Sequence, residues 1–311
     1  IKSFLPSLDG EGVCTNVQTD EVSQTMNLTD YNQIRDLLAH HGFRFSKSMG
    51  QNFLTAAWIP EKIAESAGLD DRTAVLEIGP GIGCLTVELS RRAGKVFSVE
   101  VDRSLMPVLA ETLAGCENTE ILFADVLKTD LEKIVQEDFA SYRPVVCANL
   151  PYNVTSPVLT KLVTSRLFET VTVMIQREVA LRMASQPGSK QYGVLSVLIQ
   201  AWYDVEYLFT VEPGVFNPPP KVQSAVIRMT RNQTERLGCD EQLFRRVVKT
   251  TFNQRRKMLR VSLRQIFDGR HPASTEFFQN DVMTRRPEQL SIPEFVDLTN
   301  MVKKELFTDT I

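Results

Sequence analysis

The central part of the chain alternates between short apolar runs and longer stretches in which apolar residues recur at helical spacing. From Thr73 onward this alternation is typical of βαβ units, so it predicts an open, mostly parallel sheet covered by helices. The predicted strands are Thr73–Ile78, Lys95–Val101, Glu120–Phe123, Pro144–Ala148 and Thr170–Ile175, and the intervening helices are Cys84–Ala93, Ser104–Ala114, Leu131–Phe139 and Pro157–Ser165.

The pattern changes on either side of this region. Helical spacing at Tyr31–His41 and Ala56–Ala67 predicts two helices before the sheet. Behind it, the strands Asp204–Val211 and Val222–Met229 are joined so closely that they should be antiparallel. Near Arg231 the sequence becomes polar, and the pattern of every segment after it predicts a helix. Further helices are predicted at Arg177–Ala184, Gly193–Ala201, Glu241–Thr251, Lys257–Phe267, Ser274–Gln279 and Ile292–Leu306.

These patterns predict a Rossmann-like α/β fold, parallel with an antiparallel last strand, and a small all-α C-terminal domain. We place the α/β domain at residues 27–231 and the helical domain at 232–311. Residues 1–26 are polar and lack the features of a signal peptide, so we expect a poorly ordered leader, with Met26 as a candidate start.

Composition restricts the class of protein. With 43% hydrophobic and 23% charged residues, and no apolar run long enough to span a membrane, the 311-residue chain is typical of soluble globular proteins. Its five cysteines form no CxxC pair, which favours a reducing cytoplasm over a zinc site or a disulfide framework. No histidine lies between residues 42 and 270, so we expect neither histidine catalysis nor a metal.

A polar motif follows the predicted strand Pro144–Ala148. Residues 149–152 (Asn-Leu-Pro-Tyr) bring an amide, a stiff backbone and an aromatic ring to the edge where open α/β sheets bind ligands. We expect the next helix to be capped by Ser156, with Pro157 at its first position. The Asn149 amide and the Leu150 carbonyl can hydrogen-bond a flat polar molecule, and the Tyr152 ring can stack on it.

A glycine-rich loop after the first predicted strand indicates a nucleotide-like ligand. Residues 77–83 read Glu-Ile-Gly-Pro-Gly-Ile-Gly, and Glu100 lies 21 residues after Gly79, where an acid can bind a ribose diol. NAD is one candidate. Glu77 within the loop, Asp125 after the third strand, and the 149–152 motif after the fourth favour S-adenosylmethionine instead.

Basic residues are concentrated in the predicted helical domain. The whole chain has a net charge of −3, yet residues 242–267 contain no acid at all. This segregation suggests an anionic partner rather than an ordinary solvated face, on which charges of both signs normally mix. The candidate RNA-binding residues are Arg44, Lys47, Arg245, Arg246, Lys249, Arg255, Arg256, Lys257, Arg260 and Arg264.

Several motifs together resemble the ribosomal RNA adenine dimethyltransferases, from about residue 30 to the end. They are 51–54 (Gln-Asn-Phe-Leu), 77–81, 99–102 (Val-Glu-Val-Asp), 125–126, 149–153, 216–222 (Phe-Asn-Pro-Pro-Pro-Lys-Val) and 252–257 (Phe-Asn-Gln-Arg-Arg-Lys). The resemblance implies a class I methyltransferase sheet and S-adenosylmethionine as the donor, held by Asn52, Leu54, Gly79, Glu100, Asp125 and Asn149. The forms at 149–153 and 252–257 resemble the branch that dimethylates two adjacent adenines near the 3′ end of small-subunit (16S) rRNA.

The expected mechanism needs no strong base. Hydrogen bonds from the adenine amine to the Asn149 oxygen and the Leu150 carbonyl would free its lone pair for in-line methyl transfer. Tyr152 should stack on a flipped base, with Phe216 on the opposite face, although core packing is the alternative for both rings. The candidate catalytic residues are Asn149, Leu150, Tyr152 and Phe216.

Other functions stay open at this point. The chain could methylate large-subunit rRNA, as the macrolide-resistance branch of the family does, or DNA adenine. It could also serve mainly as a non-catalytic ribosome-assembly factor that binds the small subunit. No strong dimer signal is present, so a monomer is expected.

Overall fold

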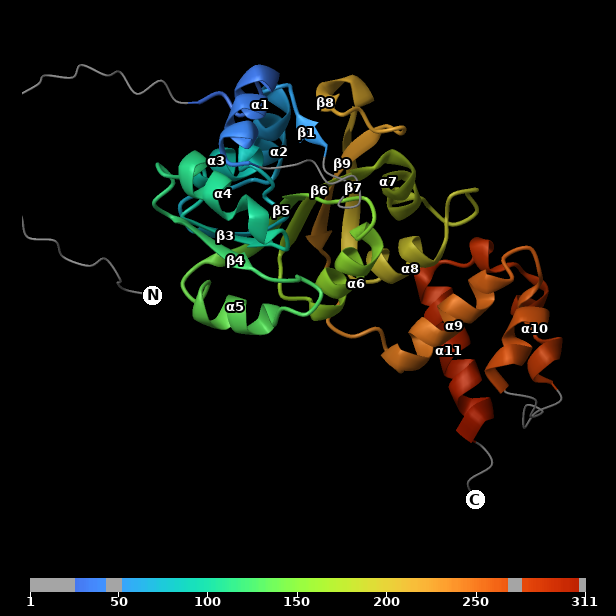
Figure 1. Ribbon diagram of the computed structural model, residues 1–311. Coiled ribbons are helices and arrows are strands. Elements are labelled where there is room, and N and C mark those ends of the chain that lie inside the picture. The colour runs from blue at the N-terminus through green and yellow to red at the C-terminus, as the bar shows by residue number, and fades with distance from the viewer. Residues whose placement is uncertain (1–25, 43–51, 268–275, 308–311) are drawn as a thin grey trace, which may run out of the picture.

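The computed structural model describes residues 26–42, 52–267 and 276–307. A seven-stranded sheet with the order β4-β3-β2-β5-β6-β9-β7 lies at its centre (Figure 1). Every pairing is parallel except those of β9, which runs antiparallel to both of its neighbours. The strands are β2 (Thr73–Ile78), β3 (Lys95–Glu100), β4 (Thr119–Phe123), β5 (Arg143–Asn149), β6 (Thr170–Gln176), β7 (Tyr203–Val211) and β9 (Ser224–Arg231). The predicted fold class is confirmed, and each predicted strand is present.

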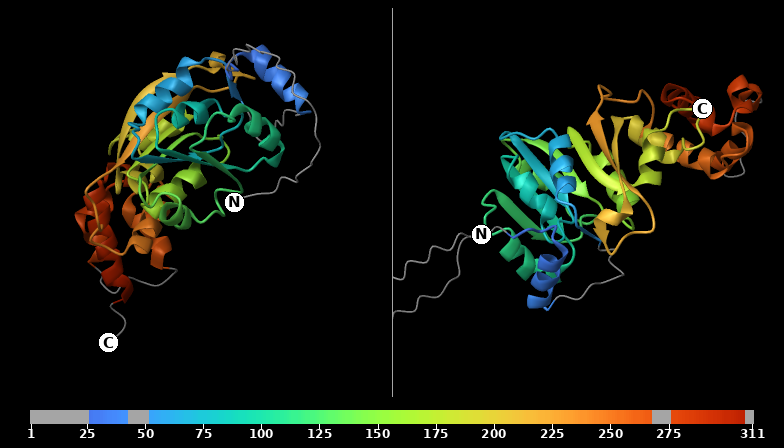
Figure 2. Two further views of the ribbon diagram at one scale, coloured as in Figure 1. Left: turned by 90° about the vertical axis from the view of Figure 1, so that its left-hand side faces the viewer. Right: turned by 90° about the horizontal axis from the view of Figure 1, so that it is seen from above.

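The central strands are buried on both faces, which explains their continuous apolar runs. In β2, Val75 packs in one apolar cluster and its neighbour Leu76 in another. The Val75 face is covered by α2 (Trp58–Ser66) and α3 (Cys84–Ser90), whose apolar residues share its cluster. The opposite face is covered by α5 (Leu131–Glu137), α6 (Thr155–Ser165), α7 (Arg177–Ala184) and α8 (Val194–Gln200). The result is a three-layer α/β arrangement (Figure 2).

A third apolar cluster closes the side of the sheet next to β4. It joins α1 (Tyr31–His40), which Asp30 caps through two backbone amides, to α4 (Met106–Thr112). Phe53 and Ile82 belong to the same cluster. The N-terminal helix is therefore fixed against the segments that surround the glycine-rich loop.

A small two-stranded sheet was not among the predicted elements. Strand β1 (Phe53–Leu54) pairs antiparallel with β8 (Phe216–Asn217). Strands of two residues have no periodicity to detect, and this pair joins parts of the chain that lie far apart in sequence. The peptide bond that follows β8, Asn217–Pro218, is cis.

Helix α6 starts earlier than predicted. It begins at Thr155, with Val154 rather than Ser156 as its N-cap residue, so Pro157 does not occupy the first helical position. The Val154 amide and the Thr155 hydroxyl both donate to the Pro151 carbonyl, at 3.2 and 3.0 Å. Because these bonds already turn the chain, the helix starts before the proline.

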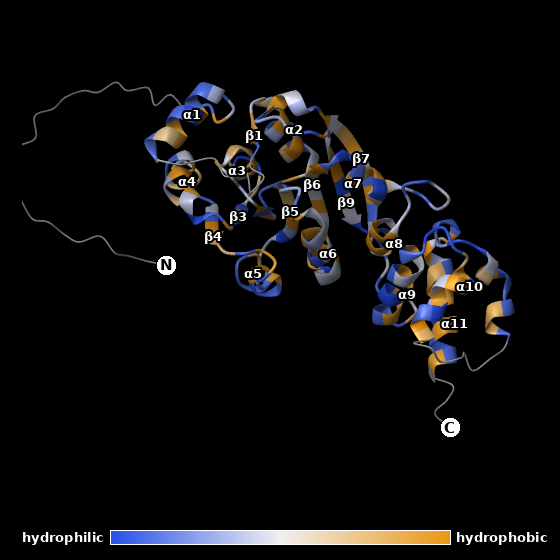
Figure 3. Cartoon of the chain, turned by 45° about the vertical axis from the view of Figure 1, so that its right-hand side comes forward, coloured by the Kyte–Doolittle hydropathy of each residue, from blue (hydrophilic) through white to orange (hydrophobic). Residues whose placement is uncertain are grey.

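The C-terminal region (residues 241–307) is helical in its described part and projects from the α8 end of the sheet (Figures 1 and 2). It contains α9 (Glu241–Asn253), α10 (Leu259–Ser262) and α11 (Ile292–Phe307), with short 3₁₀ turns between α10 and α11. The predicted helix Lys257–Phe267 is divided, since α10 gives way to a 3₁₀ turn at Leu263. Hydrophobic and hydrophilic residues alternate around these helices (Figure 3), and no described helix is long and apolar enough to cross a membrane.

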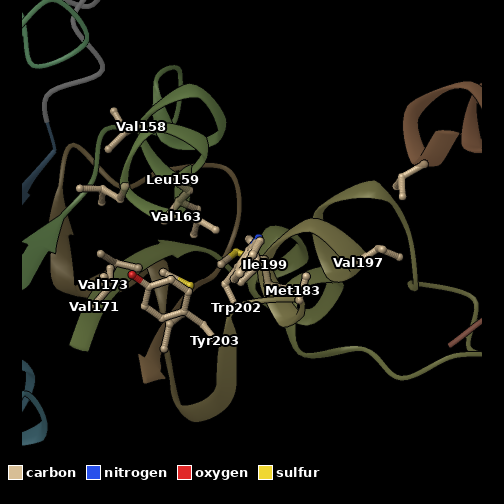
Figure 4. Close-up of a cluster of buried hydrophobic side chains, with 14 of the residues drawn as sticks. Val158, Leu159, Val163, Val171, Val173, Met183, Val197, Ile199, Trp202 and Tyr203 are labelled. Carbon is tan, nitrogen blue, oxygen red and sulfur yellow. The ribbon is translucent and has the colours of Figure 1, made fainter. Parts of the chain in front are cut away.

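One apolar cluster links the C-terminal region to the sheet. Trp202 and Tyr203 pack with Val171 and Val173 of β6 (Figure 4), and the same cluster continues into α9 and α11. The Arg166 guanidinium lies 3.5 Å above the centroid of the Trp202 ring and also forms an ion pair with Glu241 at the start of α9. These contacts hold α9 against the α/β region. The division at residues 231 and 232 remains a prediction.

Candidate active site

A cavity of about 360 Å³ opens at the carboxyl edge of the sheet, where open α/β folds bind their ligands. Residues from the ends of β2, β3, β4 and β5 meet there with residues of the β1–β8 pair. All of the predicted donor-binding and catalytic residues line it: Asn52, Leu54, Gly79, Glu100, Asp125, Asn149, Leu150, Tyr152 and Phe216. The structure therefore brings the separate motifs into one site.

The glycine-rich loop bends through backbone conformations that favour glycine. Gly79, Gly81 and Gly83 have φ angles of 72°, 60° and 91°. A Cβ atom at Gly79 would lie 3.6 Å from the Cδ atom of Pro151, which is an ordinary contact. The backbone conformation rather than a lack of space therefore favours glycine at this position.

Glu100 ends β3 and is 5% exposed. Its carboxylate accepts hydrogen bonds from the backbone amides of Gly81, at 3.3 Å, and Asp102, at 2.9 Å. Burial raises the pKa of Glu100, although the amide hydrogen bonds act in the opposite direction. The carboxylate is therefore held in a fixed orientation at the cavity, as binding to a ribose diol requires.

Asp125 lies beside the neighbouring strand end, two residues after β4. One of its carboxylate oxygens accepts a hydrogen bond of 2.9 Å from the Leu127 amide. Its side chain keeps 39% of its surface exposed, so the carboxylate can still bind an additional group. Val101 and Leu127 also line the cavity but were not predicted. The sequence indicates them only through their position, because Val101 follows Glu100 directly and Leu127 lies two residues after Asp125.

Glu77 lies beneath the glycine-rich loop and is 1% exposed. Its Oε2 atom accepts hydrogen bonds from Thr86, at 2.8 Å, and Ser98, at 2.7 Å. Burial raises the pKa of this carboxyl to about 7, which the two hydroxyl donors partly oppose. Cys84 lines the same cavity, and burial raises the pKa of its thiol to about 12, so a neutral thiol rather than a nucleophilic thiolate faces the site.

The 149–152 motif is held by a backbone hydrogen bond, while the Asn149 side chain has no hydrogen-bond partner in the part of the chain that is described. The Leu150 amide donates to the Met174 carbonyl at 3.1 Å, which continues the pairing of β5 with β6. Among the described residues, nothing hydrogen-bonds the side-chain amide of Asn149, which is partly exposed in the cavity. An amide in that state is available to a ligand.

Tyr152 and Phe216 line the cavity, as does a third aromatic residue, Phe53. The Tyr152 hydroxyl is 2.6 Å from the hydroxyl of Ser224, a fully buried residue that sequence reasoning missed. Phe216 is 5% exposed and packs with Leu54, its partner across the β1–β8 pair. Phe216 thus contributes to the core as well as to the cavity wall.

The basic residues lie apart from this cavity, in and around α9 and α10. Most are exposed, namely Arg246, Lys249, Arg256, Lys257, Arg260 and Arg264, whereas Arg245 is partly buried. Arg255 forms a 2.6 Å ion pair with Glu288 and also donates to the Ser189 carbonyl, so it has internal partners. Arg44 and Lys47 lie outside the described residues. In the part of the chain that is described, no cluster of His, Cys, Asp and Glu could hold a metal ion.

A mostly parallel sheet with an antiparallel inner strand, and with glycine-rich, acidic and Asn-Leu-Pro-Tyr segments at successive strand ends, defines a class I methyltransferase. A model of the family "Ribosomal RNA adenine dimethylase" matches residues 42–304. The chain belongs to this family, so the resemblance predicted from the motifs is confirmed.

Two relatives that align along most of their length carry the same name. Ribosomal RNA small subunit methyltransferase A of Phocaeicola vulgatus is 47% identical over 265 residues, which are 85% of this chain and 91% of the relative. The protein of the same name from Geobacillus thermodenitrificans is 43% identical over 274 residues, with 86% and 94% covered.

Two solved structures are similar along most of their length. A dimethyladenosine transferase from Plasmodium falciparum matches with a TM-score of 0.67 at 24% identity, covering 81% of this chain and 96% of its own, which supports the fold. The 23S rRNA methyltransferase ErmE matches with a TM-score of 0.58 at 27% identity, covering 81% and 100%.

S-adenosylmethionine is the methyl donor of this family, and the residues present fit it. The buried Glu100 carboxylate would hold the ribose hydroxyls, and Asp125 would hold the adenine amine. The apolar side chains of Val101 and Leu127 line the same cavity, where a planar base would be shielded from water. When bound, the donor supplies an activated methyl group on a sulfonium.

Proposed function

We propose that this protein transfers methyl groups from S-adenosylmethionine to the exocyclic amines of two adjacent adenines near the 3′ end of small-subunit (16S) rRNA. The observation that carries the proposal is the Asn149 amide at the end of β5, which has no hydrogen-bond partner among the described residues and lies in the same cavity as Glu100 and the glycine-rich loop. The names of the relatives from Phocaeicola and Geobacillus support the choice of the small subunit.

In this mechanism Asn149 and Leu150 bind the target amine. The adenine amine is a poor nucleophile because its lone pair is delocalised into the ring. Two N–H groups that donate to the Asn149 side-chain oxygen and the Leu150 carbonyl would favour a pyramidal nitrogen whose lone pair is free. Holding that nitrogen in line with the methyl group supplies much of the acceleration.

The aromatic rings would bind the base itself. Tyr152 and Phe216 line the cavity that also contains Asn149, so we assign them to the faces of a flipped adenine. No charged base is required near the amine, since the product nitrogen can release its proton to water.

The basic residues would hold the phosphates of folded RNA. The exposed cations on and around α9 and α10 lie in a stretch of sequence, residues 242–267, that contains no acid. Arg44 and Lys47 are assigned to the same role from the sequence. Binding of this kind weakens with salt because counterions are released when phosphates are neutralised. We further propose that the protein acts as a monomer in the cytoplasm.

A second candidate is methylation of large-subunit rRNA. The likeness to the 23S rRNA methyltransferase ErmE favours it, although its identity of 27% is well below that of the small-subunit relatives. A role as an assembly factor is compatible with either activity.

The test is methyl incorporation from labelled S-adenosylmethionine into unmodified small subunits, with large subunits and duplex DNA in parallel. Label only in the small subunit, recovered as dimethyladenine, is expected. Label in the large subunit would favour the second candidate function, methylation of large-subunit rRNA. Donor binding with no label in any substrate would favour the assembly-factor role.

A further inference from the structure

We propose that Ser224 is a positioning residue for the methylated base, because it anchors the hydroxyl of Tyr152 and thereby fixes that ring in the active-site cavity. The inference rests on the proposed function, since it assigns Tyr152 to the target adenine. It adds a residue that does not itself line the cavity.

The contact joins two strands that are not neighbours in the sheet. Tyr152 follows β5, whereas Ser224 is the first residue of β9, and β6 lies between them. The two hydroxyl oxygens are 2.6 Å apart, which is a short hydrogen bond. Tyr152 therefore reaches across one strand to a fixed point on the next.

Ser224 is well suited to act as that fixed point. It is fully buried, and its backbone lies in register with both Gln176 of β6 and Val211 of β7. Its side chain forms no other hydrogen bond with a described residue, and the same holds for the Tyr152 hydroxyl. Each hydroxyl is therefore the other's partner in a place where an unpaired polar group is costly.

The same contact links the two segments that supply the aromatic rings. Phe216 lies eight residues before Ser224, on the segment whose other end is held by the pairing of Phe216 with Leu54. A bond from Tyr152 to Ser224 ties the loop after β5 to the segment that carries Phe216. The spacing between the two rings must accept an adenine, and then a methyladenine for the second transfer.

Loss of the serine hydroxyl should therefore affect the second methyl transfer more than donor binding. In Ser224→Ala the Tyr152 hydroxyl stays half-buried with no partner, so the ring turns to reach water. We expect kcat to fall roughly three- to tenfold, the range expected when a single hydrogen bond is removed. We also expect monomethyladenine to accumulate and KM for S-adenosylmethionine to stay unchanged.

The experiment compares Ser224→Ala, Tyr152→Phe and the double variant, with Ser262→Ala as the control. Ser262 is also fully buried, but it lies in α10 and donates to the Leu259 carbonyl. Steady-state rates, the ratio of monomethyladenine to dimethyladenine, and melting temperatures are measured for each. The double variant leaves no orphaned tyrosine hydroxyl, so it tests the idea even where Ser224→Ala folds poorly.

The expected result is non-additive. Ser224→Ala lowers kcat in the wild-type background but adds nothing in the Tyr152→Phe background, while Ser262→Ala leaves the product ratio unchanged. An equal loss in both backgrounds, or a product ratio in Ser224→Ala that matches Ser262→Ala, would overturn the inference. If the wild-type protein does not methylate small subunits at all, the proposed function fails instead, so the two failures are distinguishable.

Discussion

Ser98 of β3 donates a hydrogen bond of 2.7 Å to the carboxylate of Glu77, the residue directly opposite it on β2. Thr86 of α3 donates to the same oxygen. One buried carboxyl therefore joins two strands and a helix beneath the glycine-rich loop. The arrangement makes the state of Glu77 important for the stability of the donor site.

The raised pKa of Glu77 predicts a specific dependence of stability on pH. In the folded protein the Glu77 carboxyl keeps its proton up to about pH 7, whereas in the unfolded chain it loses the proton near pH 4.5. Glu77 therefore makes its full contribution to the free energy of unfolding below pH 4.5, and this contribution is lost as pH rises through 7. The free energy of unfolding should fall by on the order of 3 kcal/mol across this pH range, because each unit of pKa shift corresponds to about 1.36 kcal/mol.

Glu77→Gln tests this dependence because the amide cannot ionise. Denaturant titrations of both proteins between pH 5 and 8 should show the variant gaining stability relative to the wild type as pH rises. Parallel curves for the two proteins would mean that Glu77 is ionised throughout the range.

Asn149→Ala should remove activity and leave the fold intact. Its amide has no partner among the described residues, so its loss should change the melting temperature by no more than about 2 °C. Methyl transfer should fall by at least roughly 100-fold, as when an essential transition-state hydrogen bond is deleted from other enzymes. Label incorporation and thermal melting are measured together, with the exposed Asn300→Ala as the control. Near-normal turnover in Asn149→Ala would contradict the assignment.

The exposed cations of the C-terminal region should contribute to RNA affinity through charge. Arg260 and Arg264 are exposed, one in α10 and the other in the turn that follows it. Replacing both by Gln should weaken binding to small-subunit RNA. The slope of log affinity against log salt should fall by roughly 0.7–0.9 for each phosphate that is no longer neutralised. Filter binding across a salt series measures the slope.

Lys133→Gln is the matched control for this prediction. Lys133 is also exposed but lies on α5, away from the C-terminal region (Figure 1). Lys133→Gln removes one charge and the arginine variant removes two. A salt slope that falls as much for each removed charge in Lys133→Gln as in the arginine variant would show that the effect comes from total charge rather than from the C-terminal region.

Gly94 should tolerate no side chain. A Cβ atom there would lie 2.0 Å from the Asp71 carbonyl oxygen and 2.7 Å from the Tyr142 ring. Gly94→Ala should therefore destabilise the protein by roughly 3 kcal/mol or more, because backbone must move. At Gly115 no atom lies within 4 Å of the added carbon, so Gly115→Ala should be nearly neutral. Equal unfolding free energies for the two variants would refute the packing argument.

Much of the α/β region is predictable because its strands are short and continuously apolar. Thr73–Ile78 was predicted with the same ends that the structure has, since both faces of a central parallel strand are buried. Four of the residues that line the cavity could be predicted for a related reason. Gly79, Glu100, Asp125 and Asn149 lie at or just after the carboxyl ends of strands that meet at one edge, so separate motifs imply one cavity.

The missed features depend on contacts between distant parts of the chain. The pairing of Leu54 with Phe216 and the bond from Tyr152 to Ser224 join residues that no local pattern connects. The predicted start of α6 was wrong for a local reason. The Val154 amide and the Thr155 hydroxyl donate to the Pro151 carbonyl, and the Val158 amide donates to the Val154 carbonyl, so the first turn of the helix already forms before Ser156. Only the folded arrangement shows these bonds.

The proposed reaction is dimethylation of adjacent adenines in small-subunit rRNA. It is measured by digesting rRNA from unmodified small subunits to nucleosides after incubation with the protein and donor, followed by mass spectrometry and by mapping of the modified positions. We expect dimethyladenosine at two adjacent adenines near the 3′ end with the wild type, and none with Asn149→Ala. Dimethyladenosine that appears only in large-subunit rRNA, or that persists in Asn149→Ala, would contradict this expectation.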